Sequence, residues 1–352
     1  MLQYINLLQD IIYKGTWKES ARTNMPRTKS LFGTRMEFDM KDGFPLLTTK
    51  KMYYNSIIIE LLWFLKGDTN IKYLVDNGCN IWNQDAYRWY LKKMKELDDK
   101  FYNNFRWFPV EQAEFIEIIK EGNLESSIPN YQFGDLGKVY GEQWRNQNGV
   151  DQLNTCIDRL KSDPMGRYVI IDAWNPSDFS EMALPPCHLL YQFNCRALST
   201  WERKSLLSER ENWIGQDYLI DEDPSGDIED IMEEELIPKY YLDLQMYQRS
   251  CDTFLGVPFN IASASLLLHL IAKVVNMIPS KFVWVGGDTH IYENHLGQVE
   301  EQLSRDSLTL SKLKISKDLN SLEDLVNLNK EDIEILNYKS HSAIKGELKT
   351  GL

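Results

Sequence analysis

The sequence predicts an α+β fold in which a mixed, largely antiparallel sheet is flanked by helices. Helical and strand patterns follow one another irregularly, without the regular strand-helix-strand repeat of a parallel α/β protein. The 352 residues are 43% hydrophobic and 12% aromatic, enough for one large core. We therefore expect a single domain over residues 1–352, interrupted by insertions at about 87–132 and 196–239.

Each predicted element rests on its hydrophobic pattern. Helical spacing or a long apolar run marks four helices, residues 2–13, 53–65, 151–162 and 261–277. Alternating or short apolar runs mark four strands, residues 168–174, 188–195, 240–248 and 281–286. The first insertion is rich in aromatic and charged residues and the second contains an acidic run. Both are therefore expected at the surface.

Composition narrows the class of protein. The net charge of −13 argues against broad nucleic-acid binding, which needs a basic surface. Polar residues interrupt the apolar ones near the amino terminus, so no signal peptide or membrane span is expected there. The five cysteines contain no CxxC pair, which disfavours disulfides and zinc; they are Cys79, Cys156, Cys187, Cys195 and Cys251. A cytoplasmic protein is expected, in the host cytoplasm if the source is viral.

Cys187 is the candidate nucleophile. It follows Pro185 and Pro186, and two prolines stiffen the backbone and remove amide donors just before a predicted strand. A thiol at such a corner is accessible to a substrate. The alternative for an isolated cysteine is an inert, buried packing residue.

Glu60 stands inside the apolar run of residues 53–65. Burial of a carboxylate without partners is costly and raises its pKa. Glu60 is therefore expected either to face a polar cavity or to transfer protons.

Further polar clusters indicate ligand contacts. Arg249 and Ser250 end a predicted strand, where a guanidinium and a hydroxyl suit a phosphate, although a solvated salt bridge is the commoner role of an arginine. His290 and Tyr292 lie two residues apart, on one face of a strand. Tyr140 follows a glycine-bounded turn that suits a cleft wall. No zinc spacing, phosphate loop or dinucleotide fingerprint occurs, so no metal is expected.

Six sequence blocks together resemble the thymidylate synthase family, which includes pyrimidine nucleotide hydroxymethylases. They occur in family order and span the chain from near its start to near its end; they are DGFPLLTTKK, ELLWFLKGDTN, DLGKVYGEQWR, LPPCH, QRSCDTFLGVPFNIAS and GGDTHIYENH. The resemblance implies the family's α+β fold and a one-carbon transfer from 5,10-methylenetetrahydrofolate to carbon 5 of a pyrimidine nucleotide.

Catalytic roles follow from the resemblance. Cys187 would add to carbon 6 of the nucleotide and so activate carbon 5 by covalent catalysis. Arg249 would favour the thiolate, and Glu60 would organise proton transfers. Tyr140 and Asp252 would line the catalytic cavity.

The resemblance also implies the binding residues. Asn260 would match the uracil edge, which makes dUMP the expected substrate. Phosphate would be gripped by Arg22, Arg249 and Ser250 of one chain and by Arg167 of its partner in an obligate homodimer with shared sites. His290 and Tyr292 would hold the deoxyribose. The folate side would be formed by Lys50, Trp82, Leu184, Asp252 and Gly256.

One departure from the family concerns the phosphate site. The family has two adjacent arginines where this chain has Arg167 and Tyr168. We hypothesise that Arg27 or Lys29 supplies the missing charge.

The folate side departs further. Asn83 replaces an aspartate, Ala264 replaces a tyrosine, and residues 346–352 do not resemble the apolar tail that synthases fold over the folate. A wetter pocket favours attack by water over hydride. We therefore expect a dUMP hydroxymethylase making 5-hydroxymethyl-dUMP, an activity associated with phage DNA modification. The alternative is thymidylate synthase, and a remoter one is a non-catalytic nucleotide- or RNA-binding homologue.

Overall fold

A computed structural model of the protein describes residues 1–20, 25–100, 109–209 and 227–347. Within this part of the chain, the main sheet has six strands in the order β1-β2-β6-β5-β4-β3. Only β5 and β6 run parallel, and the other neighbours are antiparallel. The predicted α+β fold with a mixed sheet is confirmed.

The strands and the longer helices have the following bounds. The strands are β1 (Thr16–Lys18), β2 (Thr28–Asp39), β3 (Ile170–Asp172), β4 (His188–Ala197), β5 (Tyr240–Asp252), β6 (Ile278–Tyr292), β7 (Lys312–Ile315) and β8 (Ile333–Leu336). The helices are α1 (Leu2–Lys14), α2 (Tyr54–Leu65), α3 (Lys72–Asp76), α4 (Asn83–Lys100), α5 (Gln112–Glu121), α6 (Tyr140–Asn146), α7 (Gln152–Ser162), α8 (Thr200–Glu209), α9 (Asp227–Glu234), α10 (Gly256–Val274), α11 (Leu296–Leu303) and α12 (Leu322–Val326).

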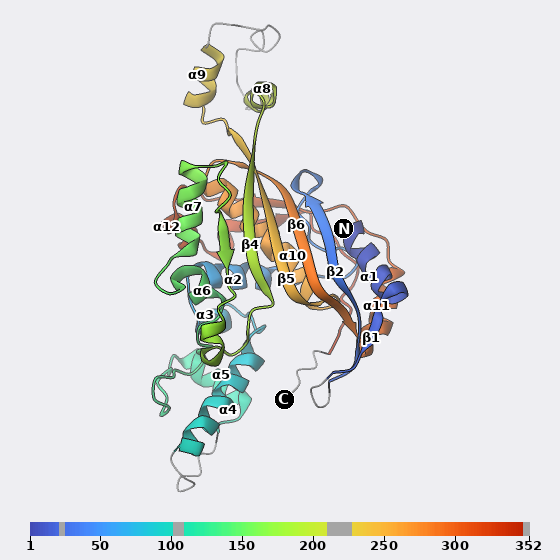
Figure 1. Ribbon diagram of the computed structural model, residues 1–352, viewed down its shortest axis with the longest axis vertical. Helices are drawn as coiled ribbons and strands as arrows, with labels where there is room; N and C mark the ends of the chain where they lie inside the picture. The colour runs from blue at the N-terminus through green and yellow to red at the C-terminus, as the bar shows by residue number, and fades with distance from the viewer. Residues whose placement is uncertain (21–24, 101–108, 210–226, 348–352) are drawn as a thin grey trace.

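Helices α2 and α10 form a layer behind the sheet in Figure 1, and the front face of β4, β5 and β6 carries no helix among the described residues. Helix α10 is long and apolar enough to cross a membrane, but 72% of its apolar window is buried inside the fold. It packs on β5, β6 and α2, as the central helix of a folded core does. The sheet therefore has one covered face and one open face.

Several helices and strands begin or end at residues other than those predicted. Helix α10 begins at Gly256, five residues before the predicted start at Ile261, and β6 continues to Tyr292 through both glycines of its GGDTH segment. Strand β3 is shorter than predicted. Strand β2 was not predicted, because Gly33, at φ 75°, interrupts its alternation. Strand β2 is stabilised by its pairing with β6, and this long-range contact cannot be seen in the local sequence pattern.

The first inserted segment is not a surface addition, contrary to the expectation. Helices α4 and α5 bury Trp89, Tyr90 and Phe115 in the main core. The rings of Tyr90 and Phe115 stack at 5.3 Å. The apolar residues of α4 and α5, which alternate with charged residues in the sequence, thus extend the core toward one end of the molecule (Figure 1).

The second segment forms a separate small unit at the opposite end (Figure 1). Helices α8 and α9 enclose a cluster of four buried residues, Leu207, Ile228, Met232 and Ile237. Much of the acidic run lies outside the described residues, and the rest forms α9 and the turn after it.

Candidate active site

Cys187 lies at the start of β4, and its backbone is held from two sides. Its N–H donates to the Tyr140 hydroxyl at 2.8 Å, and its carbonyl accepts from the N–H of Arg249 at 2.8 Å. Tyr140 begins α6 after Gly137, whose φ of 70° and close approach to the Glu181 carbonyl exclude a side chain. These hydrogen bonds fix the backbone of the partly exposed Cys187. We call the segment of residues 185–187, with Tyr140 and Arg249 bound to it, the Cys187 corner.

Arg249 on β5 grips the same corner. Its Nε donates to the Pro186 carbonyl at 2.7 Å, and a terminal nitrogen donates to the Pro185 carbonyl at 2.9 Å. A guanidinium has five N–H donors, so three of its donors are not used by these two bonds. The structure therefore brings a permanent positive charge next to Cys187.

Glu60 is joined to this corner through aromatic rings. Its carboxylate accepts from the indole N–H of Trp82 at 2.7 Å, and burial raises the pKa of Glu60 to about 7. The Trp82 ring lies edge-on to Tyr140 at 6.0 Å. The predicted rise in pKa is confirmed in direction, and Glu60, Trp82, Tyr140 and Cys187 form one continuous group.

His188 was missed by the sequence reasoning, although it follows Cys187 directly. Its ring stacks on Tyr140 at 4.4 Å, and its Nδ1 lies 2.6 Å from the Tyr191 hydroxyl. Burial lowers the pKa of His188 to about 4, so the imidazole is neutral near pH 7. Its position next to a candidate nucleophile is the signal that would have identified it.

Asn260, in the first turns of α10, is fixed by a residue that the sequence reasoning also missed. Gln248 donates from Nε2 to Asn260 Oδ1 at 2.9 Å and accepts the indole N–H of Trp284 at 3.0 Å. An indole nitrogen only donates, so Trp284 orients Gln248. Gln248 in turn binds the Asn260 oxygen and leaves its NH2 group available.

The parallel pairing of β5 and β6 aligns the remaining polar residues. Ser250 is opposite Asp288, and Asp252 is opposite His290. His290 Nδ1 lies 3.2 Å from an Asp288 oxygen, and the ring of Tyr292 is 5.1 Å from that of His290. Hydrogen bonds from His290 and from a lysine lower the pKa of Asp288 to about 2. The predicted pair on β6 therefore lies beside the end of β5.

A second wall of the site, here called the Asp252 wall, comprises Lys50, Asp252, Phe254 and Leu255. Asp252 Oδ1 accepts the N–H groups of Phe254 and Leu255, but its Oδ2 is buried with no hydrogen-bond partner among the described residues. Lys50 donates to the Phe254 carbonyl, and burial lowers the pKa of Lys50 to about 8. This wall therefore contains a buried acceptor that has no hydrogen-bond partner in the described part of the chain.

Two other residues predicted for the folate side lie near this wall or the nucleophile. Gly256 begins α10 close to Asp252, where an added Cβ would be 3.8 Å from the Asp252 Cβ. Leu184 is partly buried against the core, three residues before Cys187.

The cationic residues predicted to bind phosphate are not all gathered in this chain. Arg22 lies outside the described residues. Arg167 is exposed between α7 and β3, and no hydrogen bond or ion pair joins it to another predicted site residue in the described part of the chain. Arg27 binds Glu293 at 2.6 Å, and Lys29 binds the Ile12 carbonyl. The proposed replacement by Arg27 or Lys29 would therefore require one of these bonds to break.

The carboxyl-terminal tail reaches the Asp252 wall. The Glu347 carbonyl lies 2.9 Å from His295 Nε2, and Gly346 lies against Phe254 and Leu255. Residues 348–352 lie outside the described part. Of the segment 346–352, predicted not to resemble the apolar tail that synthases fold over the folate, the structure describes only Gly346 and Glu347, which lie against Phe254, Leu255 and His295.

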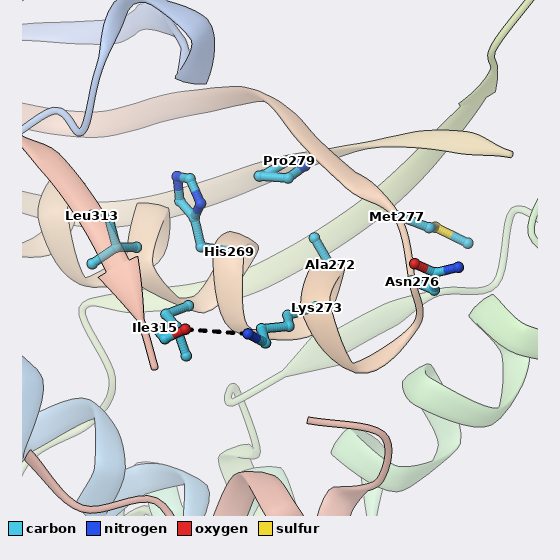
Figure 2. A pocket seen from close by; sticks show the side chains of 8 residues that line it. All are labelled: His269, Ala272, Lys273, Asn276, Met277, Pro279, Leu313 and Ile315. Atoms are coloured by element: carbon cyan, nitrogen blue, oxygen red, sulfur yellow. Dashed lines mark hydrogen bonds between the residues drawn. The ribbon is translucent and has the colours of Figure 1, made fainter. Parts of the chain in front are cut away.

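A hollow of about 330 Å³ at the other end of α10 is separate from this site. Figure 2 shows His269, Lys273 and the residues around them, with Lys273 donating to the Ile315 carbonyl at 3.1 Å. It shares no lining residue with the predicted site. Among the described residues, no group of three or more His, Cys, Asp or Glu side chains is placed to hold a metal.

Comparison with known proteins gives consistent matches. A family model described as thymidylate synthase matches residues 2–350. The chain is 44% identical to a protein named thymidylate synthase from Mycoplasma mobile, over 99% of both chains. Relatives of the same name from Malacoplasma penetrans and Mesoplasma florum are each 41% identical, again over 99% of both chains. The two segments predicted as insertions are therefore not peculiar to this chain.

Proposed function

The chain belongs to the thymidylate synthase family of folate-dependent one-carbon transferases, and we propose that it converts dUMP and 5,10-methylenetetrahydrofolate to dTMP and dihydrofolate. The observation that carries the proposal is the fixed corner of Cys187, Tyr140 and Arg249 beside the buried carboxyl of Glu60. The names of the relatives favour dTMP as the product over the hydroxymethylated nucleotide expected from the sequence.

In this proposal Cys187 attacks carbon 6 of dUMP, which makes carbon 5 nucleophilic toward the methylene group supplied by the folate. Arg249 stabilises the thiolate by its charge. Its unused donors are available for the nucleotide phosphate together with Ser250. Because two proline carbonyls hold the guanidinium, the charge does not have to be positioned when the substrate binds.

Glu60 serves the proton transfers. A carboxyl with a pKa of about 7 is partly protonated at neutral pH, so it both accepts and donates protons there. The Trp82 N–H fixes one of its oxygens. The neutral His188 ring and the Tyr140 ring help to exclude water from the surroundings of the Glu60 carboxyl.

Substrate choice rests on Asn260. With its oxygen bound to Gln248, its NH2 group faces an acceptor on the base, and uracil has a carbonyl at carbon 4 where cytosine has an amine. His290 and Tyr292 provide polar groups for the deoxyribose. The substrate of this proposal is therefore dUMP.

The co-substrate fits the Asp252 wall. The open Oδ2 of Asp252 is an acceptor for N–H groups of a pterin. We assign Lys50, Trp82, Leu184 and Gly256 to the same folate side. Asn83 and Ala264 still favour the hydroxymethylase as the second candidate. The position of the tail against Phe254 and His295 supports exclusion of water and hence dTMP.

A homodimer with shared sites is part of the proposal. The sheet face without helices offers a surface for a second copy, and the exposed Arg167 would reach the partner's nucleotide phosphate. Mixing Cys187→Ser with Arg167→Ala subunits tests this. Shared sites predict that the mixture regains activity because one site of each hybrid has both residues, whereas independent sites predict no gain.

The deciding experiment is mass spectrometry of the nucleotide formed from dUMP and 5,10-methylenetetrahydrofolate, with absorbance followed for dihydrofolate. Gain of CH2 with dihydrofolate supports the proposal. Gain of CH2O with tetrahydrofolate establishes the hydroxymethylase instead. No covalent change in dUMP would leave only a binding protein.

A further inference from the structure

We propose that His295 is a positioning residue that holds the carboxyl-terminal tail on the Asp252 wall and thereby decides how much product is lost to water. The inference rests on the proposed function and adds to it a residue that determines the fate of the reacting carbon. His295 follows β6 in a short 3-10 turn, Glu293–His295, outside the groups assigned above to chemistry or substrate.

The imidazole of His295 is fully buried and joins three parts of the site. Its Nε2 lies 2.9 Å from the Glu347 carbonyl. A carbonyl only accepts, so Nε2 carries the proton in this contact. The ring lies 5.1 Å from that of Phe254 and 5.9 Å from that of Tyr292. His295 is therefore in contact with the tail, the Asp252 wall and the end of β6.

The tail is shaped to fit this contact. A Cβ at Gly346 would lie 2.7 Å from Phe254, 3.1 Å from Leu255 and 3.2 Å from His295 Nε2. Any side chain there would move the tail outward, so glycine permits the close approach. The bonds that Asn294 and Gln298 make to tail carbonyls are longer, at 3.4 and 3.5 Å. Of these three bonds, the one from His295 is the shortest.

Movement of the tail is transmitted to the ligand-facing groups through Phe254. Its N–H binds Asp252 Oδ1, its carbonyl accepts from Lys50, and its ring lies 3.8 Å from the Lys50 ammonium. A tail seated on this ring covers the same residue that positions both charged groups. Loss of the His295 bond uncovers the wall without removing any group that binds the nucleotide.

The consequence is a change in product ratio. After the folate leaves carbon 5, the nucleotide carries an exocyclic methylene. Hydride from tetrahydrofolate adds to this methylene, the bond between carbon 6 and the Cys187 thiolate breaks, and dTMP and dihydrofolate form. Addition of water to the methylene, with loss of a proton and release of the same thiolate, gives 5-hydroxymethyl-dUMP and leaves tetrahydrofolate. A seated tail excludes water and favours the first route. One hydrogen bond contributes about 1 kcal/mol net, so we expect a shift of about fivefold rather than a complete switch.

The experiment compares His295→Phe, which keeps a ring but removes the N–H, with His295→Gln, which retains an N–H donor. Limited trypsin digestion after Lys345 removes residues 346–352, digestion after Lys349 removes residues 350–352, and intact mass distinguishes the two losses. We expect His295→Phe to lose the tail about fivefold faster than the wild type, and His295→Gln to resemble the wild type. Equal rates for both folded variants would overturn the inference.

Gly346→Ala provides the same test with the substitution in the tail itself, and Lys345→Ala is its matched control. We expect Gly346→Ala to raise the share of 5-hydroxymethyl-dUMP and the KM for the folate about fivefold, with dUMP affinity unchanged. Lys345→Ala should behave as the wild type. An unchanged product ratio in Gly346→Ala contradicts the inference. If the wild type makes no dTMP, the proposed function fails, while the digestion still tests the tail contact.

Discussion

The Cys187 corner and the Asp252 wall differ in how their buried polar groups are satisfied. At the corner, Tyr140, Arg249 and Gln248 each make hydrogen bonds within the chain. On the other side of the site, Asp252 Oδ2 and His295 Nδ1 are buried without a hydrogen-bond partner among the described residues. An unsatisfied buried polar group costs about 1 to 3 kcal/mol.

This difference indicates which part of the site is organised before a ligand binds. A corner whose groups already have partners is organised before any substrate binds, so the nucleotide of the proposed reaction would meet a preformed site. The wall keeps its open acceptors although Gly346 and Glu347 already lie beside it, so it would gain the missing hydrogen bonds only when a second molecule binds. The following predictions test this contrast.

The largest effect is expected at the corner. Cys187→Ser replaces the thiolate with a poor nucleophile, so kcat should fall by about 10⁴-fold or more. Since the corner is organised by backbone contacts, dUMP affinity should remain near that of the wild type. Steady-state kinetics and calorimetric titration with dUMP measure the two quantities. Retained turnover would exclude Cys187 as the nucleophile.

The next largest effect is expected at the Asp252 wall and distinguishes it from the Cys187 corner. Asp252→Asn keeps an oxygen for the N–H groups of Phe254 and Leu255 but presents an amide in place of the open oxygen. We expect kcat/KM for the folate to fall about 100-fold, with dUMP affinity unchanged. Kinetics at varied folate and at varied dUMP distinguish these results. An equal loss for both substrates would show that the two regions are not independent.

Glu60, which is linked to the corner through Trp82 and Tyr140, gives a pH-dependent effect. Its pKa is raised by burial from 4.5 to about 7, so between these values the native state retains a proton that the unfolded state has lost. The free energy of unfolding therefore falls as pH rises through this window, by up to about 1.4 kcal/mol per pH unit. Urea denaturation of wild type and Glu60→Gln checks this. Below pH 4.5, where both states are protonated, the difference between the two proteins should no longer change with pH.

The smallest effect is expected from a change in the orientation of the Asn260 amide. Gln248→Leu removes the hydrogen bond that fixes the Asn260 amide, so we expect dUMP affinity to fall about fivefold and discrimination against dCMP to weaken. Competition binding with the two nucleotides measures both. Unchanged discrimination would mean that packing alone orients Asn260.

The sequence by itself determined the fold class, the family resemblance and the candidates Cys187, Glu60 and Arg249, because these depend on local patterns. The two prolines before Cys187, the carboxyl in an apolar helix and the arginine at a strand end are each visible in one short segment. Helices α1, α2 and α7 were located for the same reason, since a helix forms its backbone hydrogen bonds within one segment.

The tertiary structure decided what depends on distant contacts. Strand β2 exists because it pairs with β6, more than 200 residues away in the chain. The aromatic residues of α4 and α5 are buried because the core continues beneath them. His188, Gln248 and His295 gain their significance only when separate segments meet, and the tail touches Phe254 because the fold brings residues 254 and 346 together. Hydrogen bonds and packing contacts between residues far apart in the chain produce no periodic pattern in the sequence.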